Sequence, residues 1–262
     1  MKKYISVVLL FVLTIHNSVF AFSSDTNPIL NRLRGTDGNS VLILMYHKLS
    51  DNPNEISDFC IKPSDFEKDI CILKQEGYVF CTAGDLVNLN KENKAKYVLI
   101  TFDDGYESDY TLALPILEKY NAKATFFVFG GAIGRPDYID EKQLFNLSQS
   151  KNAEIGNHSY NLHNNTYARI KQMYLSSEND SVIVDDFVKN KIILEKITGK
   201  SITALSYPNG IHNDRIDTQL RKCGISITFS TNERMERLSA WGSVLGRFNR
   251  GMNTDISKII SK

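Results

Sequence analysis

Short, continuously apolar runs that are rich in β-branched and aromatic residues recur along the chain. The clearest examples are residues 41–47, 97–102 and 124–129. Runs of this length and composition are typical of strands that are buried on both faces, as the strands of parallel sheets are. Segments with helical periodicity separate the runs, so each connection has room for a crossover helix. The alternation therefore predicts an α/β fold of parallel strands joined by right-handed crossovers.

The number of these units favours a barrel over an open sheet. Further strands are expected at 78–81, 153–158, 203–207 and 225–229, with a last strand ending at Phe248. The expected helices cover 63–76, 82–89, 110–120, 140–147, 184–198, 215–223 and 255–260, with a polar insertion at 164–182. About seven strand–helix units favour a distorted (β/α) barrel, in which functional side chains gather at the carboxyl ends of the strands.

The N-terminus has the features of a secretory signal peptide. Lys2 and Lys3 precede an apolar core from Ile5 to Ile15, and small residues near Ala21 offer a cleavage site. The apolar run is short for a membrane span, although an uncleaved N-terminal anchor is the alternative. We therefore expect a signal peptide at 1–21, a lead-in at 22–40 and one domain over 41–262. The mature protein would be secreted, periplasmic or at the cell surface, without a stable membrane span.

Charge and cysteine content limit the partners of the chain. The 31 basic and 30 acidic residues give a formal net charge of +1, which offers no electrostatic case for a nucleic acid or an anionic membrane surface. The four cysteines, at positions 60, 71, 81 and 223, form no C-x-x-C pair, so a zinc–thiolate site is not expected. Disulfides and free thiols both remain open for an exported protein, and the sequence does not predict an oligomeric state.

The expected strand at 97–102 leads directly into two adjacent carboxylates, Asp103 and Asp104, followed by Gly105. Neighbouring residues on a strand point to opposite faces, so the two side chains need different surroundings. Two carboxylates this close repel each other, and a metal ion bound to one of them would relieve the repulsion. Taken alone, the motif could also be a polar turn at the end of a strand.

Histidines mark other strand ends and supply candidate metal ligands. His158 ends the expected strand at 153–158, and His163 follows five residues later. On a straight helix two residues at this spacing would diverge, but on a turn they could converge on one ion. Together with Asp104 they would give a divalent metal such as Zn²⁺ two imidazoles and one carboxylate, with positions left open. Asp103 would then be free to take a proton from water, which suits hydrolysis of an amide or an ester.

A hydrolase of an amide also needs a general acid for the departing amine. His47, at the end of the first expected strand, is the best remaining candidate, although a contact with the substrate or a structural role is the alternative. His212 follows Asn209 and Gly210, and we expect it to be an exposed turn residue.

Taken together, these residues resemble the motifs of the polysaccharide deacetylases, carbohydrate esterase family 4, which contain the NodB-homology domain. Residues 101–105 resemble the first motif, and His158 with Ser159 and His163 resembles the second. Residues 45–47, 124–128 and 206–210 fit the Met-Tyr-His branch, which includes poly-N-acetylglucosamine deacetylases. The resemblance implies a distorted (β/α) barrel and metal-dependent removal of N-acetyl, sometimes O-acetyl, groups from a glycan. It also implies Asp103 as the base and Asp104 as a ligand, with Zn²⁺ as the expected metal and Co²⁺ or Ni²⁺ as alternatives.

The chain departs from the family pattern in three places. His158 and His163 are five residues apart, where many members have a spacing of four, and this spacing resembles the subgroup that acts on poly-β-1,6-N-acetylglucosamine. Ser206 stands two residues before Pro208, so the arginine that orients the base at this motif in the family is absent; Arg247 or Arg250 could replace it, and we favour Arg247. The late Leu-x-His motif that supplies the acid in many members is also missing, which strengthens the hypothesis for His47.

The resemblance also suggests three substrate contacts. They are Tyr207, Pro208 and Trp241. Trp241 could form a wall of the acetyl pocket, or it could be an ordinary core residue.

The leading hypothesis is a metal-dependent N-deacetylase of an extracytoplasmic glycan that contains N-acetylglucosamine. The alternatives are an O-acetyl esterase acting on xylan or cell-wall glycan, and a catalytically silent glycan-binding module of the same fold. The presence of all four residues Asp103, Asp104, His158 and His163 argues against the silent module. The sequence does not choose among acetylated polysaccharides and oligosaccharides as the substrate.

Overall fold

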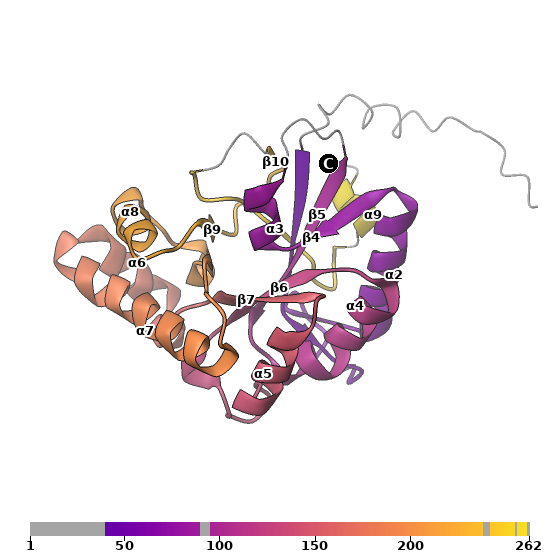
Figure 1. Ribbon diagram of the computed structural model, residues 1–262, viewed down its shortest axis with the longest axis horizontal. Helices are drawn as coiled ribbons and strands as arrows, with labels where there is room; N and C mark the ends of the chain where they lie inside the picture. Colours follow the sequence, from indigo (N-terminus) through magenta and orange to yellow (C-terminus); the bar gives the residue numbers. More distant parts are fainter. Residues whose placement is uncertain (1–39, 90–94, 238–241, 255, 261–262) are drawn as a thin grey trace, which may run out of the picture. The chain divides into compact units, whose positions relative to one another are not determined.

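A curled, mostly parallel sheet organises the computed structural model of the protein (Figure 1). The structure describes residues 40–89, 95–237, 242–254 and 256–260. Within these ranges nine strands belong to the sheet, in the order β10-β1-β5-β6-β7-β8-β9, with β11 beside β1 and β4 beside β5. The strands of this sheet are β1 (Ser40–Tyr46), β4 (Tyr78–Cys81), β5 (Lys96–Asp104), β6 (Ala124–Val128), β7 (Ala153–Asn157), β8 (Ala204–Ser206), β9 (Ile227–Phe229), β10 (Glu236–Arg237) and β11 (Phe248–Asn249). Two short strands, β2 (Lys48–Leu49) and β3 (Cys60–Ile61), form a separate parallel pair.

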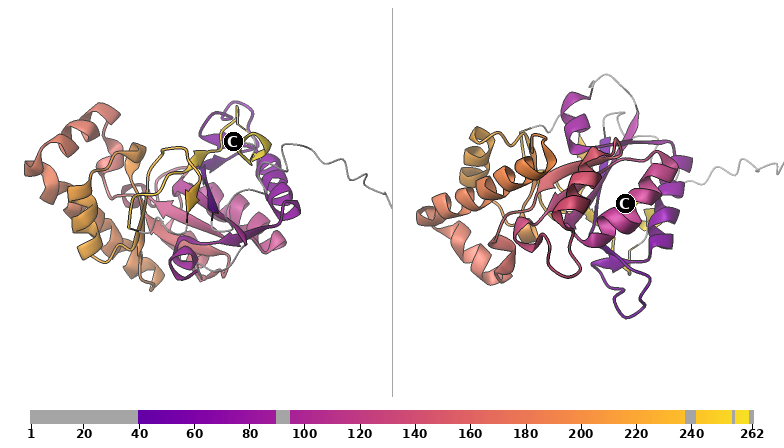
Figure 2. Two further views of the ribbon diagram at one scale, coloured as in Figure 1. Left: turned by 90° about the horizontal axis from the view of Figure 1, so that it is seen from above. Right: turned by 60° about the horizontal axis from the view of Figure 1, so that its bottom comes forward.

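Helices connect the successive strands from β3 to β9, as the sequence pattern predicts. The α-helices are α2 (Pro63–Gln75), α3 (Ala83–Asn88), α4 (Leu114–Tyr120), α5 (Glu141–Gln149), α6 (Tyr167–Leu175), α7 (Asp180–Thr198), α8 (Asp214–Lys222) and α9 (Ile256–Ile260). Shorter helical turns are the π-helical η1 (Asp109–Ala113) and the 3₁₀ turns η2 (Gly130–Ala132), η3 (Leu162–Asn164), η4 (Ser177–Asn179) and η5 (Pro208–Gly210). Figures 1 and 2 show α2, α4 and α5 along one part of the sheet and α6, α7 and α8 along another.

Strand alternation divides the buried side chains between the two faces of the sheet. On β1 and β5, residues such as Leu42 and Val98 face outward and pack in one cluster with α2, α4 and α5. Their neighbours Ile43 and Leu99 face the interior of the curled sheet, with Phe127 of β6. Both faces are therefore apolar, which explains why these strands appear as continuous apolar runs in the sequence.

The interior changes character toward the carboxyl ends of the strands. Five buried residues form a polar interior layer there: Thr101, Asp103, Ser206, Ser230 and Arg247. Buried polar groups are stable only when they are hydrogen-bonded, so this layer requires specific partners. The layer therefore marks the end of the sheet where function is expected.

The gap between the two ends of the curled sheet is spanned by residues 245–249, which we name the closing segment. Leu245 forms a parallel bridge with Phe229 of β9, while Phe248 and Asn249 form β11 and pair with β1. Arg247 lies between these two points of pairing. The closing segment thus joins β9 to β1 and carries Arg247 into the polar interior layer.

Several predictions concern residues outside the described ranges. The expected signal peptide at 1–21, nearly all of the lead-in at 22–40, and Trp241 lie there. Within the described ranges, no helix is both long enough and apolar enough to cross a lipid bilayer.

All four cysteines are free thiols, with Cys60 and Cys81 buried and Cys223 exposed. Burial raises the pKa of Cys60 and Cys81, and the thiolate is the reactive form. We expect a thiol reagent to modify Cys223 first in the folded protein and to count four thiols after unfolding. Fewer than four thiols in denaturant without reductant would show that a disulfide is present.

Candidate active site

Two adjacent carboxylates at the end of β5 occupy different surroundings. Asp103 continues the strand alternation and faces the interior, where it is 3% exposed. Asp104 has a φ of 79°, a left-handed conformation that is uncommon for residues other than glycine. This conformation ends the strand and turns the side chain away from the regular alternation. Gly105, also left-handed, follows at a close approach, because an added Cβ would lie 3.0 Å from the Cγ1 atom of Val128.

Asp104 converges with two histidines from neighbouring elements. Its Oδ1 atom lies 2.9 Å from Nε2 of His163 and 3.4 Å from Nε2 of His158. The three candidate ligand atoms all lie within 4.8 Å of one another. Oδ1 of Asp104 is buried, and within the described part of the chain no donor reaches it with good hydrogen-bond geometry, although both imidazoles lie close to it.

A hydrogen bond at its Nδ1 atom orients the imidazole of His158. Its Nδ1 atom lies 2.9 Å from the carbonyl oxygen of Ser206. Because a carbonyl only accepts, Nδ1 carries the proton, and Nε2 is left to face Asp104. Metal-binding histidines commonly donate their other N–H in this way. Two imidazole nitrogens and one carboxylate oxygen therefore fit a Zn²⁺ site that keeps a position open for water or substrate.

The charges of this group depend on one another. Burial alone would raise the pKa of Asp104, but the imidazoles of His158 and His163 hold it well below its ordinary value. Burial acts to lower the pKa of His158, but Asp103 and Asp104 raise it above the ordinary value. The cluster is therefore a negative site that favours bound positive charge, whether that charge is a proton or a metal ion.

Asp103 is held by a bidentate ion pair with Arg247. The Nη1 and Nη2 atoms of Arg247 each donate to one oxygen of Asp103, at 2.7 Å in both cases. The remaining donors of Arg247 reach Thr101 Oγ1, Ser206 Oγ and Ser230 O at 3.0, 2.7 and 3.0 Å. Arg247 is fully buried, and its planar fork explains how one side chain satisfies so many acceptors.

The ion pair keeps Asp103 in its charged form. Burial acts to raise the pKa of this carboxyl, but Arg247 and then His158 outweigh it, and the net shift is downward. Ser206 adds a hydrogen bond to the Oδ2 atom of Asp103 at 3.2 Å. The residue that stands in place of the motif arginine therefore contacts both Asp103 and Arg247.

His47 and Arg250 lie near the end of β1 in different roles. The ring of His47 meets that of Phe59 edge-on, with centroids 5.0 Å apart. Burial lowers the pKa of His47, although Asp104 and Asp103 act in the opposite direction, so it lies within the electrostatic field of the site. Arg250 does not pair with Asp103, because its Nε atom donates to Asp69 at 2.7 Å.

Three other residues predicted from the sequence follow the end of β8. Tyr207 is fully buried, and its hydroxyl donates to Asp217 at 2.9 Å, so its side chain is not exposed for a contact with substrate. Pro208 begins η5, which lies beside the η3 turn that carries His163. His212 is half-buried and stacks on Tyr207 instead of projecting from an exposed turn.

Two acidic residues near the site were not anticipated from the sequence. Asp109 is 1% exposed, and neither carboxylate oxygen has a hydrogen-bond partner within the described ranges. Burial, reinforced by Asp104 and Asp103, raises its pKa well above the ordinary value and so favours the protonated form. The carboxylate of Asp186 accepts hydrogen bonds from backbone N–H groups of the loop before His163. The position of Asp109 just after the first motif is a weak indication in the sequence that it lies near the site. Nothing in the sequence around Asp186 indicates its contact with this loop.

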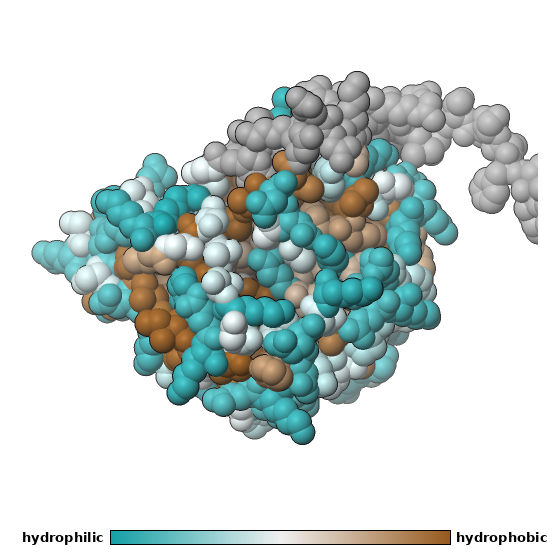
Figure 3. Space-filling model, viewed as in Figure 1, coloured by the Kyte–Doolittle hydropathy of each residue, from teal (hydrophilic) through white to brown (hydrophobic). Residues whose placement is uncertain are grey.

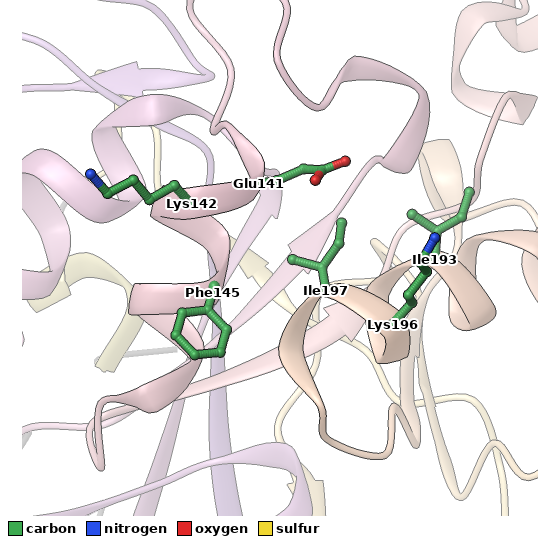
Figure 4. Close-up of a pocket in the computed structure, with 6 residues that line it drawn as sticks. All are labelled: Glu141, Lys142, Phe145, Ile193, Lys196 and Ile197. Atoms are coloured by element: carbon green, nitrogen blue, oxygen red, sulfur yellow. The ribbon is translucent and has the colours of Figure 1, made fainter.

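A separate groove lies on the outer side of the sheet, between α5 and α7. Figure 4 shows its lining residues on the two helices, and Figure 3 shows apolar surface among polar residues in this region. The groove has a volume of about 720 Å³ and is lined by Glu141, Lys142, Phe145, Ile193, Lys196 and Ile197. None of these residues belongs to the group around Asp103 and Asp104.

Comparison with known proteins identifies the family of the chain and agrees with its fold. A family model described as polysaccharide deacetylase matches residues 90–228. The chain is 29% identical over 257 residues to a poly-β-1,6-N-acetyl-D-glucosamine N-deacetylase of Staphylococcus aureus (strain MSSA476), with 89% of this chain and 87% of the relative covered. Because the family model covers more than half of the sequence, the chain belongs to the polysaccharide deacetylase family. It is a hydrolase that acts on carbon–nitrogen bonds other than peptide bonds.

Solved structures confirm the predicted fold. IcaB from Ammonifex degensii superimposes with a TM-score of 0.77 at 24% identity and covers 86% of this chain and 97% of its own. The Streptococcus pyogenes deacetylase PplD, solved in complex with acetate, has a TM-score of 0.72 at 25% identity and covers 84% of this chain and 96% of its own. The distorted (β/α) barrel is therefore correct, with short strands such as β10 and β11 added at its closing edge.

Replacing Arg247 should expose the cost of a buried, unpaired carboxylate. We expect Arg247→Met to lower the free energy of unfolding by about 3–5 kcal/mol near neutral pH. The paired Asp103 of the native protein contributes stability above its unfolded-state pKa and loses it as the pH falls through its lowered folded-state pKa. In the variant burial would be opposed only by weaker neighbours such as His158, so the pKa of Asp103 would rise. The penalty would then shrink as the pH falls and the carboxyl is protonated.

Urea unfolding with a chelator present, at about pH 7 and about pH 5, measures this effect. The stability difference between native protein and variant should shrink at the lower pH. Arg215→Met, which breaks an exposed ion pair with Asp180, is the matched control and should cost at most about 1 kcal/mol. A loss in Arg247→Met that is the same at both pH values would contradict the electrostatic explanation.

Proposed function

We propose that the protein removes N-acetyl groups from a polysaccharide that contains N-acetylglucosamine, with a divalent metal, foremost Zn²⁺, held by Asp104, His158 and His163. The observation that carries this proposal is the convergence of those three ligand atoms beside a carboxylate, Asp103, that is fixed by Arg247. A metal site and an adjacent base are the two parts that hydrolysis of an unactivated amide needs.

The substrate class rests on similarity. The Staphylococcus aureus relative is named for poly-β-1,6-N-acetyl-D-glucosamine, and the match extends over most of both chains. The signal-like residues 1–21 support action outside the cytoplasm, where such a polymer would be met. We therefore place the reaction on an exported or surface glycan.

Asp103 is the proposed general base. Its lowered pKa keeps it ionised near neutral pH, and the bidentate pair with Arg247 fixes the plane of the carboxylate. We expect it to accept a proton from the water molecule that attacks the acetyl carbonyl. When bound, the metal would polarise that carbonyl and lower the pKa of water, so that a weak base is sufficient.

His47 is the proposed general acid. It would donate a ring proton to the nitrogen of the departing amino sugar. Asp104 and Asp103 favour the protonated ring that an acid requires, while burial acts in the opposite direction and lowers the pKa of His47 overall. The edge-on contact with Phe59 restrains the ring at the end of β1.

Asp103→Asn tests the role of the base. The change keeps the shape of the side chain but removes its ability to take a proton, so acetate release should fall by at least about 10²-fold while Zn²⁺ still binds. Asp104→Asn is the matched variant one residue along, and it should lose both Zn²⁺ and activity. Enzymatic acetate assay and metal analysis of the same preparations measure both. Full activity of Asp103→Asn would show that another group is the base.

His47→Gln distinguishes an acid from a substrate contact. Glutamine keeps a hydrogen-bonding group but supplies no titrating proton, so kcat should fall by about 10²–10⁴-fold with little change in KM. Steady-state kinetics on a soluble acetylated oligosaccharide measure the two constants. A raised KM with unchanged kcat would mean that His47 binds the substrate and does not act as the acid.

A substrate panel tests the polymer class. We expect acetate release from β-1,6-linked N-acetylglucosamine oligomers to exceed release from chitooligosaccharides, peptidoglycan and acetylxylan. Asp103→Asn serves as the inactive control for each substrate. Release from acetylxylan alone would identify an O-acetyl esterase and overturn the proposed reaction.

A further inference from the structure

One carboxylate on α7 organises the loop between the two candidate histidine ligands. Asp186 accepts hydrogen bonds from the backbone N–H groups of Tyr160 and Asn161, each at 2.8 Å, and from that of Leu162 at 3.5 Å. These are three successive residues, and His163 follows directly. A charged acceptor that gathers consecutive N–H groups fixes the path of the main chain more strongly than a neutral one.

The loop needs an external acceptor because of its shape. Ser159 has a φ of 72°, so the chain leaves β7 through a left-handed residue and cannot continue the ladder of the sheet. The carboxylate of Asp186 supplies partners for N–H groups that neither a strand nor a helix supplies here. This is how a spacing of five residues brings His158 and His163 to one point.

A second contact from α7 holds the start of the same loop. Asn190 donates through Nδ2 to the carbonyl of Val128 at 2.9 Å and to Oδ1 of Asn157 at 2.8 Å. That Oδ1 atom also accepts the N–H of Ser159 at 2.9 Å. Side chains of α7 thus hold the chain on both sides of His158, and Asp186 is the one that holds the backbone directly before His163.

We propose that Asp186 is a positioning residue that sets the separation of His158 and His163 and, through it, the metal affinity of the site. The inference rests on the proposed metal-dependent function. Asp186 touches neither substrate nor metal in this assignment and acts only through the backbone of residues 160–162. Outer partners that orient metal ligands typically contribute a factor of about 10–100 to metal affinity.

The test is Zn²⁺ affinity of the full chain, measured by competition with a chromophoric chelator. In Asp186→Asn, one oxygen becomes an NH₂ group that faces a backbone N–H, so at least one hydrogen bond is lost with almost no change in volume. We expect Zn²⁺ to bind about 10–100-fold more weakly. Asp185→Asn removes an exposed carboxylate one residue away on the same helix and should leave the affinity unchanged.

A second variant, His163→Ala, distinguishes an effect on the position of His163 from a general loss of structure. When His163→Ala has already removed the ligand, adding Asp186→Asn should change Zn²⁺ affinity little, because its effect passes through His163. Hydrogen exchange of the native protein gives a measurement that needs no variant. The amide of Asn161, an exposed residue, should be protected because its N–H is bound to Asp186.

The outcomes are distinct. Weaker Zn²⁺ binding in Asp186→Asn alone, with a protected Asn161 amide, supports the proposal. Equal affinity of Asp186→Asn and the native protein, an equal loss in both backgrounds, or a freely exchanging Asn161 amide overturns it. Absence of Zn²⁺ binding by the native protein would instead overturn the proposed function, and this inference with it.

Discussion

The buried ion pair between Asp103 and Arg247 is the interaction on which the rest of the site depends. Two charges removed from water are tolerated only when each finds enough partners, and here all of the guanidinium donors reach oxygen atoms. Those oxygens belong to β5, to β8 and to the residue after β9. The ion pair therefore connects separate strands of the barrel at the level where its interior becomes polar, and it fixes the proposed base relative to the candidate metal ligands.

Ser206 links the two halves of the site. Its hydroxyl contacts Asp103 and Arg247, while its carbonyl accepts the Nδ1 proton of His158. One residue at the end of β8 thus orients both the proposed base and a proposed metal ligand. The resemblance implies an arginine at this position of the family motif, and in this chain Arg247 supplies the guanidinium group that contacts Asp103.

The sequence predicts those parts of the molecule that depend on local pattern. Apolar runs and helical periodicity located the long strands and most helices, and the acidic and histidine strand ends located the group around Asp104. The choice between Arg247 and Arg250 required the register of a two-residue strand. Phe248 packs in the outer cluster, so alternation turns Arg247 inward, but β11 is too short to be recognised without its partner. Asp186 was missed because it bonds to backbone atoms of residues 160–162, and no side-chain pattern records such a contact.

The closing segment links the formation of the buried ion pair to the closure of the barrel. Arg247 lies 144 residues after Asp103, between the points where the chain bridges β9 and pairs with β1. In the unfolded chain Asp103 therefore has no counter-charge beside it. Arg247 reaches Asp103 only when the closing segment pairs with both β9 and β1, so closure of the barrel and pairing of this buried carboxylate depend on each other.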